Sequence, residues 1–389
     1  MNRIYASPKL LFGENALQGL EELPPGPICI VTDPFLVTSG GVKAVTQVLD
    51  RQQRSYTIFS EIEPDPSIQI VSRGLQHIFR HKPDTVIALG GGSAIDAAKA
   101  ILYFCVRFKA GFMDRKYIHK PYFVAIPTTS GTGSEVTSYA VVTDRENNVK
   151  IPLSDQMMIP DMAILDADFT KTLPPDLVAN TGMDVLTHAV EAFVSRQAND
   201  FSDMYAKSAA QIAFNHLPAL YRQIENQALR EKMYTASTMA GLAFTNSGLG
   251  INHSIAHTLG AQFHIPHGRA NAMLLPYSIA YNAGLSPYRK EGVPHRYAEL
   301  ARHLGFDYPD DKMACRALIA VMESFNQLLG IPSSLKALGV ERPVLEEKLD
   351  GCIQTILSDM CTASNPVEIA PAQLRQLLLD VYEGKALWK

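Results

Sequence analysis

The sequence predicts an α/β domain, built on a parallel sheet flanked by helices, followed by an all-α domain. Two observations predict this order. Up to about residue 175, short apolar runs alternate with helical patterns, which is typical of a parallel sheet covered by helices. Beyond that point, long alanine- and leucine-rich helical patterns follow one another without a comparable run of strands. We therefore predict an N-terminal domain over residues 1–178 and a C-terminal domain over residues 179–389.

Five apolar runs of the first domain have the composition of buried strands. They are PICIVTD at 27–33, SYTIFS at 55–60, DTVIALG at 84–90, YFVAIP at 122–127 and MAILD at 162–166. Two segments between them, 67–81 and 93–107, carry apolar residues at helical spacing. Because parallel strands need a crossover between them, this alternation predicts helices on both faces of the sheet.

Seven helical patterns fill the second domain. They cover residues 175–195, 202–222, 226–245, 250–262, 311–329, 343–359 and 371–383. A chain of 389 residues is long enough for two domains that each bury a core of their own.

The composition is that of an ordinary globular protein, with 47% hydrophobic and 19% charged residues. A net charge of −4 and scattered basic residues give no reason to expect nucleic acid or an anionic membrane as a partner. The five cysteines form no CxxC motif, which favours reduced thiols. The N-terminus lacks a secretory layout, and no unbroken apolar stretch of about 18 residues occurs. We therefore expect a cytoplasmic protein.

Two glycine-rich segments follow predicted strands of the first domain. GGGSAIDAAK at 90–99 joins a strand to a helix, and PTTSGTGSE at 127–135 follows the next strand. Glycines let the backbone approach a ligand closely, and the N–H groups at a helix start attract phosphate. Glycine at such turns can also serve packing alone, but two loops together favour a pyrophosphate and hence a dinucleotide. Neither loop is a Walker A motif, and no GxGxxG follows the first strand.

Asp33 ends the first predicted strand. A carboxylate there can bind ribose hydroxyls and would repel a 2′-phosphate, which favours NAD over NADP. An equally good interpretation is that Asp33 caps a helix or turn that begins at Pro34.

The second domain contains a group of residues with the spacing of metal ligands. Asp184 and His188 are four residues apart in a helical pattern, and Glu191 shares their face. His253 and His257 repeat this spacing, and His267 follows in a PHG sequence that predicts a sharp turn. A single Asp–His pair is more often a surface or capping feature. Three further histidines make a metal site the better interpretation, and its ligand types suit Fe(II), Zn or Mn equally.

His264 lies between the helical pattern and the PHG sequence, and we expect it to be solvated. The candidate metal ligands are therefore Asp184, His188, His253, His257 and His267, and spacing alone does not divide them further.

These motifs resemble those of the iron-dependent (group III) alcohol dehydrogenases. The matching segments are FGENAL, VTD, GGGSAIDAAK, PTTSGTGSEVT, PDMAILD, TGMDVLTHAVEA and GLGINHSIAHTLGAQFHIPHGRANAMLLP. They extend over nearly the whole chain, and the resemblance is closest to the 1-propanol dehydrogenases of bacterial microcompartments. It implies a dinucleotide-binding first domain and a metal-binding catalytic second domain.

The resemblance also implies roles for individual residues. Asp184, His188, His253 and His267 would hold the metal, either Fe(II) or Zn, while His257 would be a non-ligand that transfers a proton near the nicotinamide. The cofactor NAD(H) would contact Asp33, Gly91, Gly92, Ser93, Thr128, Thr129, Thr132 and Lys150. Asp65 stands where many relatives carry Asn. The N-terminal strand of the family usually joins that of a second subunit, which implies a homodimer or a higher oligomer.

We therefore predict an NAD-dependent alcohol dehydrogenase that interconverts short aldehydes and primary alcohols, such as propanal and 1-propanol or acetaldehyde and ethanol. The metal would polarise the carbonyl group, NADH would supply hydride and His257 would pass a proton. A microcompartment shell protein is a further expected partner, and the enzyme would lie in the cytoplasm or inside such a compartment.

Three other interpretations remain open. One is a polyol dehydrogenase of the same family, acting on 1,3-propanediol or on lactaldehyde and 1,2-propanediol, or a lyase of the dehydroquinate synthase type. The second is a non-catalytic microcompartment component whose metal is structural, since a closed four-ligand site suits a structural role. The third, metal-dependent phosphoryl transfer, is disfavoured because no P-loop lysine is present.

Overall fold

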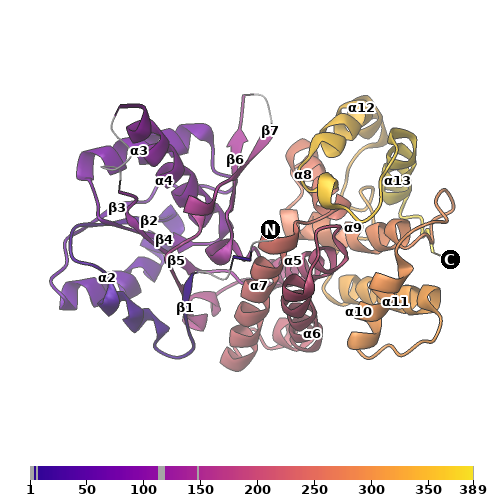
Figure 1. The fold of residues 1–389 in the computed structure, drawn as a ribbon, viewed down its shortest axis with the longest axis horizontal. Helices are drawn as coiled ribbons and strands as arrows, with labels where there is room; N and C mark the ends of the chain where they lie inside the picture. The colour runs from indigo at the N-terminus through magenta and orange to yellow at the C-terminus, as the bar shows by residue number, and fades with distance from the viewer. Residues whose placement is uncertain (1–3, 6–7, 113–118, 147–148, 389) are drawn as a thin grey trace. The chain divides into compact units, whose positions relative to one another are not determined.

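The computed structural model describes residues 4–5, 8–112, 119–146 and 149–388 (Figure 1). The chain divides into two compact units, of which one is Tyr5–Thr172 and the other contains Leu173–Lys389. This division lies a few residues before the predicted boundary between residues 178 and 179. The division does not test the functions that the sequence predicts for the two domains.

The first unit contains a six-stranded sheet with the order β1-β8-β5-β4-β2-β3, in which every neighbouring pair of strands is parallel. Its strands are β1 (Lys9–Phe12), β2 (Ile28–Val31), β3 (Tyr56–Phe59), β4 (Thr85–Gly90), β5 (Tyr122–Pro127) and β8 (Met162–Leu165). Its helices are α1 (Pro34–Thr38), α2 (Gly41–Arg51), α3 (Ile68–His81) and α4 (Gly92–Phe112). The predicted parallel sheet with flanking helices is therefore confirmed.

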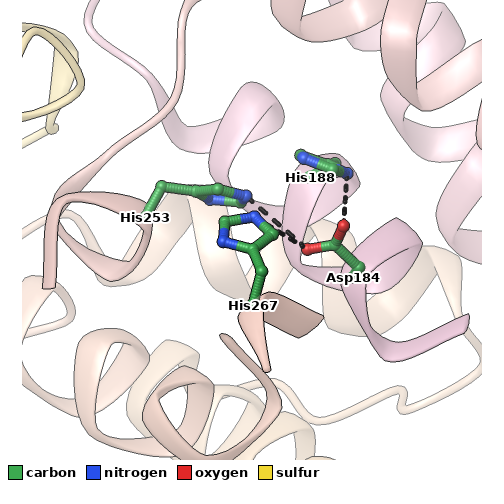
Figure 2. Close-up of side chains that lie close together, drawn as sticks. All are labelled: Asp184, His188, His253 and His267. Carbon is green, nitrogen blue, oxygen red and sulfur yellow. Dashed lines mark ion pairs between the residues drawn. The ribbon is translucent and has the colours of Figure 1, made fainter. Parts of the chain in front are cut away.

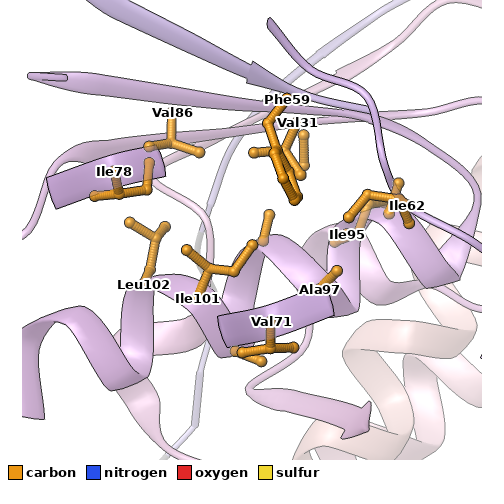
Figure 3. Packing of buried hydrophobic residues seen from close by; sticks show 14 of the residues in the cluster. Val31, Phe59, Ile62, Val71, Ile78, Val86, Ile95, Ala97, Ile101 and Leu102 are labelled. Carbon is orange, nitrogen blue, oxygen red and sulfur yellow. The ribbon is translucent and has the colours of Figure 1, made fainter. Parts of the chain in front are cut away.

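Alternate residues of the central strands enter two different cores. Val31, Phe59 and Val86 belong to the core that also contains apolar side chains of α3 and α4 (Figure 3). Ile30 and Ile87, their neighbours in sequence, belong to the other core with side chains of α2. Burial of each such side chain contributes about 2 kcal/mol to stability. Because both faces of the strands are covered, β2 and β4 are continuous apolar runs without polar alternation.

Two strand features were not among the five strands that the apolar runs predict. β1 is a four-residue edge strand that pairs with β8. β6 (Tyr139–Asp144) and β7 (Val149–Ser154) form a separate antiparallel pair. This unit also contains the short 3₁₀ helices η1 (Ala16–Glu22), η3 (Ser134–Val136), η4 (Gln156–Met158) and η5 (Ala167–Thr170). The β6–β7 pair follows the second glycine-rich loop directly, so it bears on the position of that loop.

The second unit is helical, as predicted, and no strand occurs among its described residues. Its helices are α5 (Pro175–Val194), α6 (Asp200–Arg222), α7 (Gln227–Ser247), α8 (Ile251–Phe263), α9 (His267–Asn282), α10 (Pro294–His303), α11 (Asp311–Leu328), α12 (Arg342–Ser358) and α13 (Pro371–Glu383), with a 3₁₀ turn η6 (Thr362–Ser364). The seven predicted helical patterns are present, and α9 and α10 are additional.

In the part of the chain that the structure describes, no helix has the length and apolar character needed to cross a membrane. The five cysteines are buried and unbridged.

Candidate functional site

Four side chains from three helices converge in the second unit (Figure 2). Asp184 and His188 lie on α5, His253 on α8 and His267 on α9, and their ligand atoms all lie within 4.8 Å of one another. One carboxylate oxygen of Asp184 is 3.8 Å from Nε2 of His253 and 3.5 Å from Nε2 of His267. Its other oxygen is 3.9 Å from Nδ1 of His188. Atoms spaced in this way can share one cation, because metal–ligand bonds of about 2.0–2.2 Å place neighbouring ligands at such separations.

The helices bring these residues together in two ways. On α5 the four-residue spacing places Asp184 and His188 on one face, as predicted. His267 is the first residue of α9 and Pro266 is its N-cap, so the prediction of a sharp PHG turn was wrong: the segment begins a helix. A Cβ atom on Gly268 would lie 2.2 Å from the carbonyl oxygen of Asn180, so glycine lets the start of α9 approach the backbone of α5.

Burial keeps one ligand, His253, in its neutral form. Asp184, His188 and His253 are buried, while the side chain of His267 is 32% exposed. Burial lowers the pKa of His253 well below its ordinary value, and the neighbouring imidazoles lower it further. The imidazole is therefore neutral at physiological pH, which is the form that binds metal ions.

Glu191 supports His253 from the side opposite the other ligands. Its Oε2 atom lies 2.6 Å from Nδ1 of His253, and its Oε1 atom accepts a hydrogen bond of 2.8 Å from the backbone N–H of Asn252. Burial raises the pKa of the Glu191 carboxyl to about 8. A cation beside Nε2 of His253 would favour the ionised carboxylate and hold the imidazole proton on Nδ1, which leaves the Nε2 lone pair for the metal.

Asn271 was not anticipated from the sequence, and its amide contacts three of the candidate ligands. Its amide nitrogen lies 2.7 Å from Oδ1 of Asp184, 3.0 Å from Nε2 of His253 and 3.1 Å from Nε2 of His267. Its amide oxygen accepts a hydrogen bond of 3.0 Å from Asn252, which fixes the orientation of the amide. The NH₂ group of Asn271 thus lies among the same three atoms that a cation would bind. The chemistry of the ligand set fits a divalent cation, because one carboxylate oxygen with three imidazole nitrogens suits Fe(II), Zn or Mn.

His257 lies beside this group. Its ring centroid is 5.3 Å from that of His267 and 5.9 Å from that of His253. Its Nδ1 atom is 3.0 Å from Oδ2 of Asp359, which sequence reasoning did not identify. The four-residue spacing that grouped His257 with the ligands thus places it next to them. His264 is exposed at the end of α8, as expected.

In the first unit the two glycine-rich loops lie against each other. They follow β4 and β5, which are neighbours in the sheet. A Cβ atom on Gly91 would lie 3.3 Å from Oγ1 of Thr129, and one on Gly92 would lie 2.8 Å from Cγ2 of Thr132. The carboxyl ends of adjacent parallel strands are where dinucleotides bind in open α/β sheets. The fold thus brings four predicted positions together at the carboxyl ends of β4 and β5, namely Gly91, Gly92, Thr129 and Thr132.

Asp33 follows β2 at the same edge of the sheet. Its Oδ1 atom accepts a hydrogen bond of 2.8 Å from the backbone N–H of Leu36, so Asp33 is the N-cap of α1. The capping interpretation is therefore confirmed. The bond uses one oxygen only, and Oδ2 points toward Gly90, where a Cβ atom would lie 3.6 Å from it. The cap thus leaves a carboxylate oxygen at the edge of the sheet.

The other predicted cofactor residues lie near these loops. The backbone N–H of Thr128 donates to the carbonyl oxygen of Gly90 at 3.0 Å. Oγ of Ser93 accepts a hydrogen bond of 3.3 Å from the backbone of Asp65, which has a left-handed φ of 52°. The ammonium group of Lys150 is 2.7 Å from Oδ1 of Asp65. Lys150 on β7 is therefore engaged by a carboxylate of the chain, and its predicted contact with the cofactor stays a prediction.

A buried lysine, which sequence reasoning missed, ties the second loop to α4. Nζ of Lys99 donates to Oγ of Ser134 at 3.0 Å, Oγ1 of Thr137 at 2.9 Å and the carbonyl oxygen of Tyr139 at 2.8 Å. Ser134 in turn donates to Asp96 at 2.6 Å. Burial raises the pKa of Asp96 and lowers that of Lys99 to about 8. This network fixes the end of the second glycine-rich loop on α4, the helix that follows the first glycine-rich loop.

Comparison with known proteins matches both units to one family. Residues 7–167 match the family described as iron-containing alcohol dehydrogenase. Residues 178–382 match the C-terminal domain of the Fe-containing alcohol dehydrogenase family.

Individual relatives agree with these matches. The chain is 43% identical to the 1-propanol dehydrogenase PduQ of Citrobacter freundii, over 96% of this chain and 97% of that protein. It is 41% identical to the bifunctional aldehyde-alcohol dehydrogenase AdhE of Escherichia coli K12, over 92% of this chain but only 43% of that longer protein. A crystal structure of a 1,3-propanediol oxidoreductase is similar with a TM-score of 0.88 and 31% identity, covering 98% of this chain and all of that one.

Proposed function

The chain belongs to the iron-containing alcohol dehydrogenase family, and on this premise we propose that it interconverts short-chain aldehydes and primary alcohols with NAD(H). The observation that carries the proposal is the convergence of one carboxylate and three imidazoles from α5, α8 and α9. A Lewis acid held there assists a reaction in which charge develops on a carbonyl oxygen, and reduction of an aldehyde is such a reaction.

Asp184, His188, His253 and His267 are the residues that would hold the metal. The bound metal would supply Lewis acidity toward the carbonyl oxygen of the substrate. With a cation bound, Glu191 would keep the proton of His253 on Nδ1. Asn271 donates a hydrogen bond to Oδ1 of Asp184, which orients that carboxylate.

His257 is the proton carrier in this proposal. It lies next to His253 and His267, and the ring stacks nearly parallel to that of His267, with an angle of 14° between their planes. In alcohol oxidation it would take the hydroxyl proton, directly or through water, while hydride passes from the carbinol carbon to NAD⁺. In aldehyde reduction both transfers run in reverse.

The first unit would bind the nucleotide. Gly91, Gly92, Thr129 and Thr132 would surround the pyrophosphate together with Ser93 and Thr128, since close backbone approach needs the missing side chains of the glycines. Asp33 would accept hydrogen bonds from the adenosine ribose through Oδ2. Its charge would repel the 2′-phosphate of NADPH, so we propose NADH as the preferred cofactor.

We propose propanal and acetaldehyde as substrates on the basis of the similarity to a 1-propanol dehydrogenase over nearly the full length of both proteins. The similarity to a 1,3-propanediol oxidoreductase structure favours one second candidate, reduction of 3-hydroxypropanal to 1,3-propanediol. The two differ by a terminal hydroxyl group, so relative kcat/KM for propanal and 3-hydroxypropanal would distinguish them.

The proposal extends to the oligomeric state of the protein, to a protein partner and to its location in the cell. We propose a homodimer joined through β1, which is an edge strand that pairs with β8 on one side and with no other strand of the described residues. A shell protein as partner is proposed from the resemblance to microcompartment 1-propanol dehydrogenases. Location in the cytoplasm or inside such a compartment is proposed from the same resemblance.

The central test is NADH-dependent reduction of propanal and acetaldehyde before metal removal, after it, and after refilling with Fe(II) or Zn. Activity should disappear with the metal and return with at least one of the two ions. Full activity in the metal-free protein would refute the proposal. A structural role is tested separately, since binding of NAD should raise the melting temperature of an enzyme and would leave that of a scaffold protein unchanged.

A further inference from the structure

Asp359 holds His257 through a hydrogen bond between residues that are far apart in sequence. Nδ1 of His257 on α8 lies 3.0 Å from Oδ2 of Asp359, which follows the last residue of α12. The side chains of His257 and Asp359 are 22% and 13% exposed. The pair is therefore largely shielded from water, while the histidine keeps some access to it.

The other oxygen of Asp359 is anchored independently. Oδ1 accepts a hydrogen bond of 2.8 Å from the backbone N–H of Cys361 and one of 3.1 Å from the hydroxyl of Ser254. Thr362 donates to Ser254 at 2.8 Å. Burial by itself would raise the pKa of Asp359, but its hydrogen bonds, first of all the one from His257, bring it below its ordinary value. The carboxylate is thus ionised at neutral pH and has a fixed orientation.

This orientation determines which nitrogen of His257 carries the proton. An ionised carboxylate only accepts hydrogen bonds, so Nδ1 must be the N–H donor. Nε2 is then left with a lone pair in the neutral imidazole. Stacking on His267, with centroids 5.3 Å apart, fixes the plane of the ring. Both the tautomer and the orientation of His257 are therefore set before substrate binds.

We propose that Asp359 is a positioning residue, which presents Nε2 of His257 as the proton acceptor in alcohol oxidation and the proton donor in aldehyde reduction. This inference rests on the proposed function, since only that reaction gives His257 a proton to carry. In oxidation the alcohol hydroxyl proton passes to Nε2 and the carbinol hydride passes to NAD⁺. The imidazolium, stabilised by the Asp359 carboxylate, then releases its proton to water, and the products are aldehyde, NADH and one proton.

The decisive variant is Asp359→Asn. If the amide oxygen keeps the bonds from Cys361 and Ser254, the NH₂ group takes the place of Oδ2 and donates to Nδ1 of His257. His257 must then carry its proton on Nε2, which is the wrong tautomer for accepting one there. Loss of a positioned acid–base group costs roughly 10²–10⁴ in rate, so kcat should fall at least about a hundredfold. The KM for NADH and the metal content should not change.

A second measurement does not depend on activity. In full-length, zinc-loaded protein with ¹⁵N-labelled histidine, the ring nitrogens of His257 are assigned by their absence from a His257→Gln variant. The wild type should show the Nδ1–H tautomer and Asp359→Asn the Nε2–H tautomer. The control is Asp380→Asn on α13, which removes another buried carboxylate of the same unit and should leave kcat unchanged.

The outcomes separate the two proposals. An Nε2–H tautomer in the wild type, or an unchanged kcat in Asp359→Asn, would overturn the role of Asp359 while the dehydrogenase function stands. Absence of metal-dependent aldehyde reduction in the wild type would instead overturn the function on which this role rests. If Asp359→Asn does not fold, the wild-type tautomer decides the question alone.

Discussion

Nδ1 of His253 and Oε2 of Glu191 are 2.6 Å apart, although the two residues lie on different helices and 62 positions apart in the chain. Glu191 lies on α5 and is not one of the four candidate ligands, but it contacts the ligand His253 directly. The same carboxylate accepts the backbone N–H of Asn252 at the start of α8. Glu191 thus orients the imidazole of His253 and also holds the start of α8, the helix that carries His253.

Glu191→Gln should weaken metal binding about 10–100-fold. The Gln oxygen would keep the backbone hydrogen bond of Asn252, so the amide NH₂ would donate to Nδ1 of His253. The imidazole would then carry its proton on Nε2, where the metal should bind. Competition with a chromogenic chelator measures the affinity, and circular dichroism verifies the fold. Asp380→Asn is the matched control, and an unchanged affinity in Glu191→Gln would show that Glu191 serves packing only.

Gly92→Ala should raise the KM for NADH roughly tenfold, because overpacking of this kind costs about 1–3 kcal/mol. The added Cβ would lie 2.8 Å from Cγ2 of Thr132 and would push the second loop away from the first. Gly111→Ala on the same helix is the control, since its Cβ would meet no atom within 4 Å. That variant should keep the KM of the wild type, and an equal rise in both variants would contradict the prediction.

Asp33→Asn should shift the cofactor preference toward NADPH. Asn is as good an N-cap as Asp, so the hydrogen bond to Leu36 and the start of α1 should persist. The variant therefore removes the negative charge without removing the cap. We expect kcat/KM for NADPH relative to NADH to rise about tenfold, as like-charge repulsion of a phosphate is relieved. A ratio equal to that of the wild type would mean that Asp33 is a cap and nothing more.

Lys99 should make the free energy of unfolding depend on pH in the alkaline range. Its pKa is 10.5 in the ordinary state and is lowered to about 8 in the fold by burial. Between these values the unfolded chain binds more protons at this residue than the folded one, so stability rises with pH in this window. Below pH 8 both states are protonated, and the buried ammonium lowers stability by a constant amount.

The variant Lys99→Met lacks this term. The free energy of unfolding of the wild type should therefore rise relative to that of Lys99→Met from pH 8 to pH 10.5, and the difference should be constant from pH 6 to pH 7. Urea unfolding followed by far-ultraviolet circular dichroism measures both. Parallel curves across the alkaline range would show that Lys99 does not change its charge on unfolding there.

The central strands were predictable because both of their faces are buried. β2 and β4 are runs of apolar residues, and such runs stand out in a sequence. β1 and the β6–β7 pair were missed for the opposite reason. No residue of β1 or β7 is buried, and only two residues of β6 are, so none of these strands is a continuous buried apolar run. β7 also contains Pro152, which argues against a strand.

α9 was missed because its burial removes the usual signal. Every residue from Ala270 to Asn282 is buried, so the helix has no polar face and no 3.6-residue periodicity. Pro276 and Gly268 inside it also argue against a helix. α10 is short and mainly polar, with buried residues only on one side.

The candidate site was predictable to the extent that it depends on local spacing. The four-residue separation of Asp184 and His188 is a property of one helix, and the sequence also placed Glu191 on that face. The contacts from Asn271 and Asp359 depend on how separate helices pack, which no local pattern encodes. Lys99 was missed because lysine is rarely buried, and only its hydrogen-bond partners make burial tolerable.

Gly268 places a limit on how this protein can evolve. With 2.2 Å between its missing Cβ and the Asn180 carbonyl oxygen, any other residue there would separate the two helices that carry Asp184 and His267. A change of metal preference requires substitutions at the ligands or at their neighbours, and it does not require a substitution at Gly268. Descendants that change their metal should therefore keep this glycine. Lineages in which Gly268 is replaced should also lose the metal-binding arrangement of Asp184 and His267.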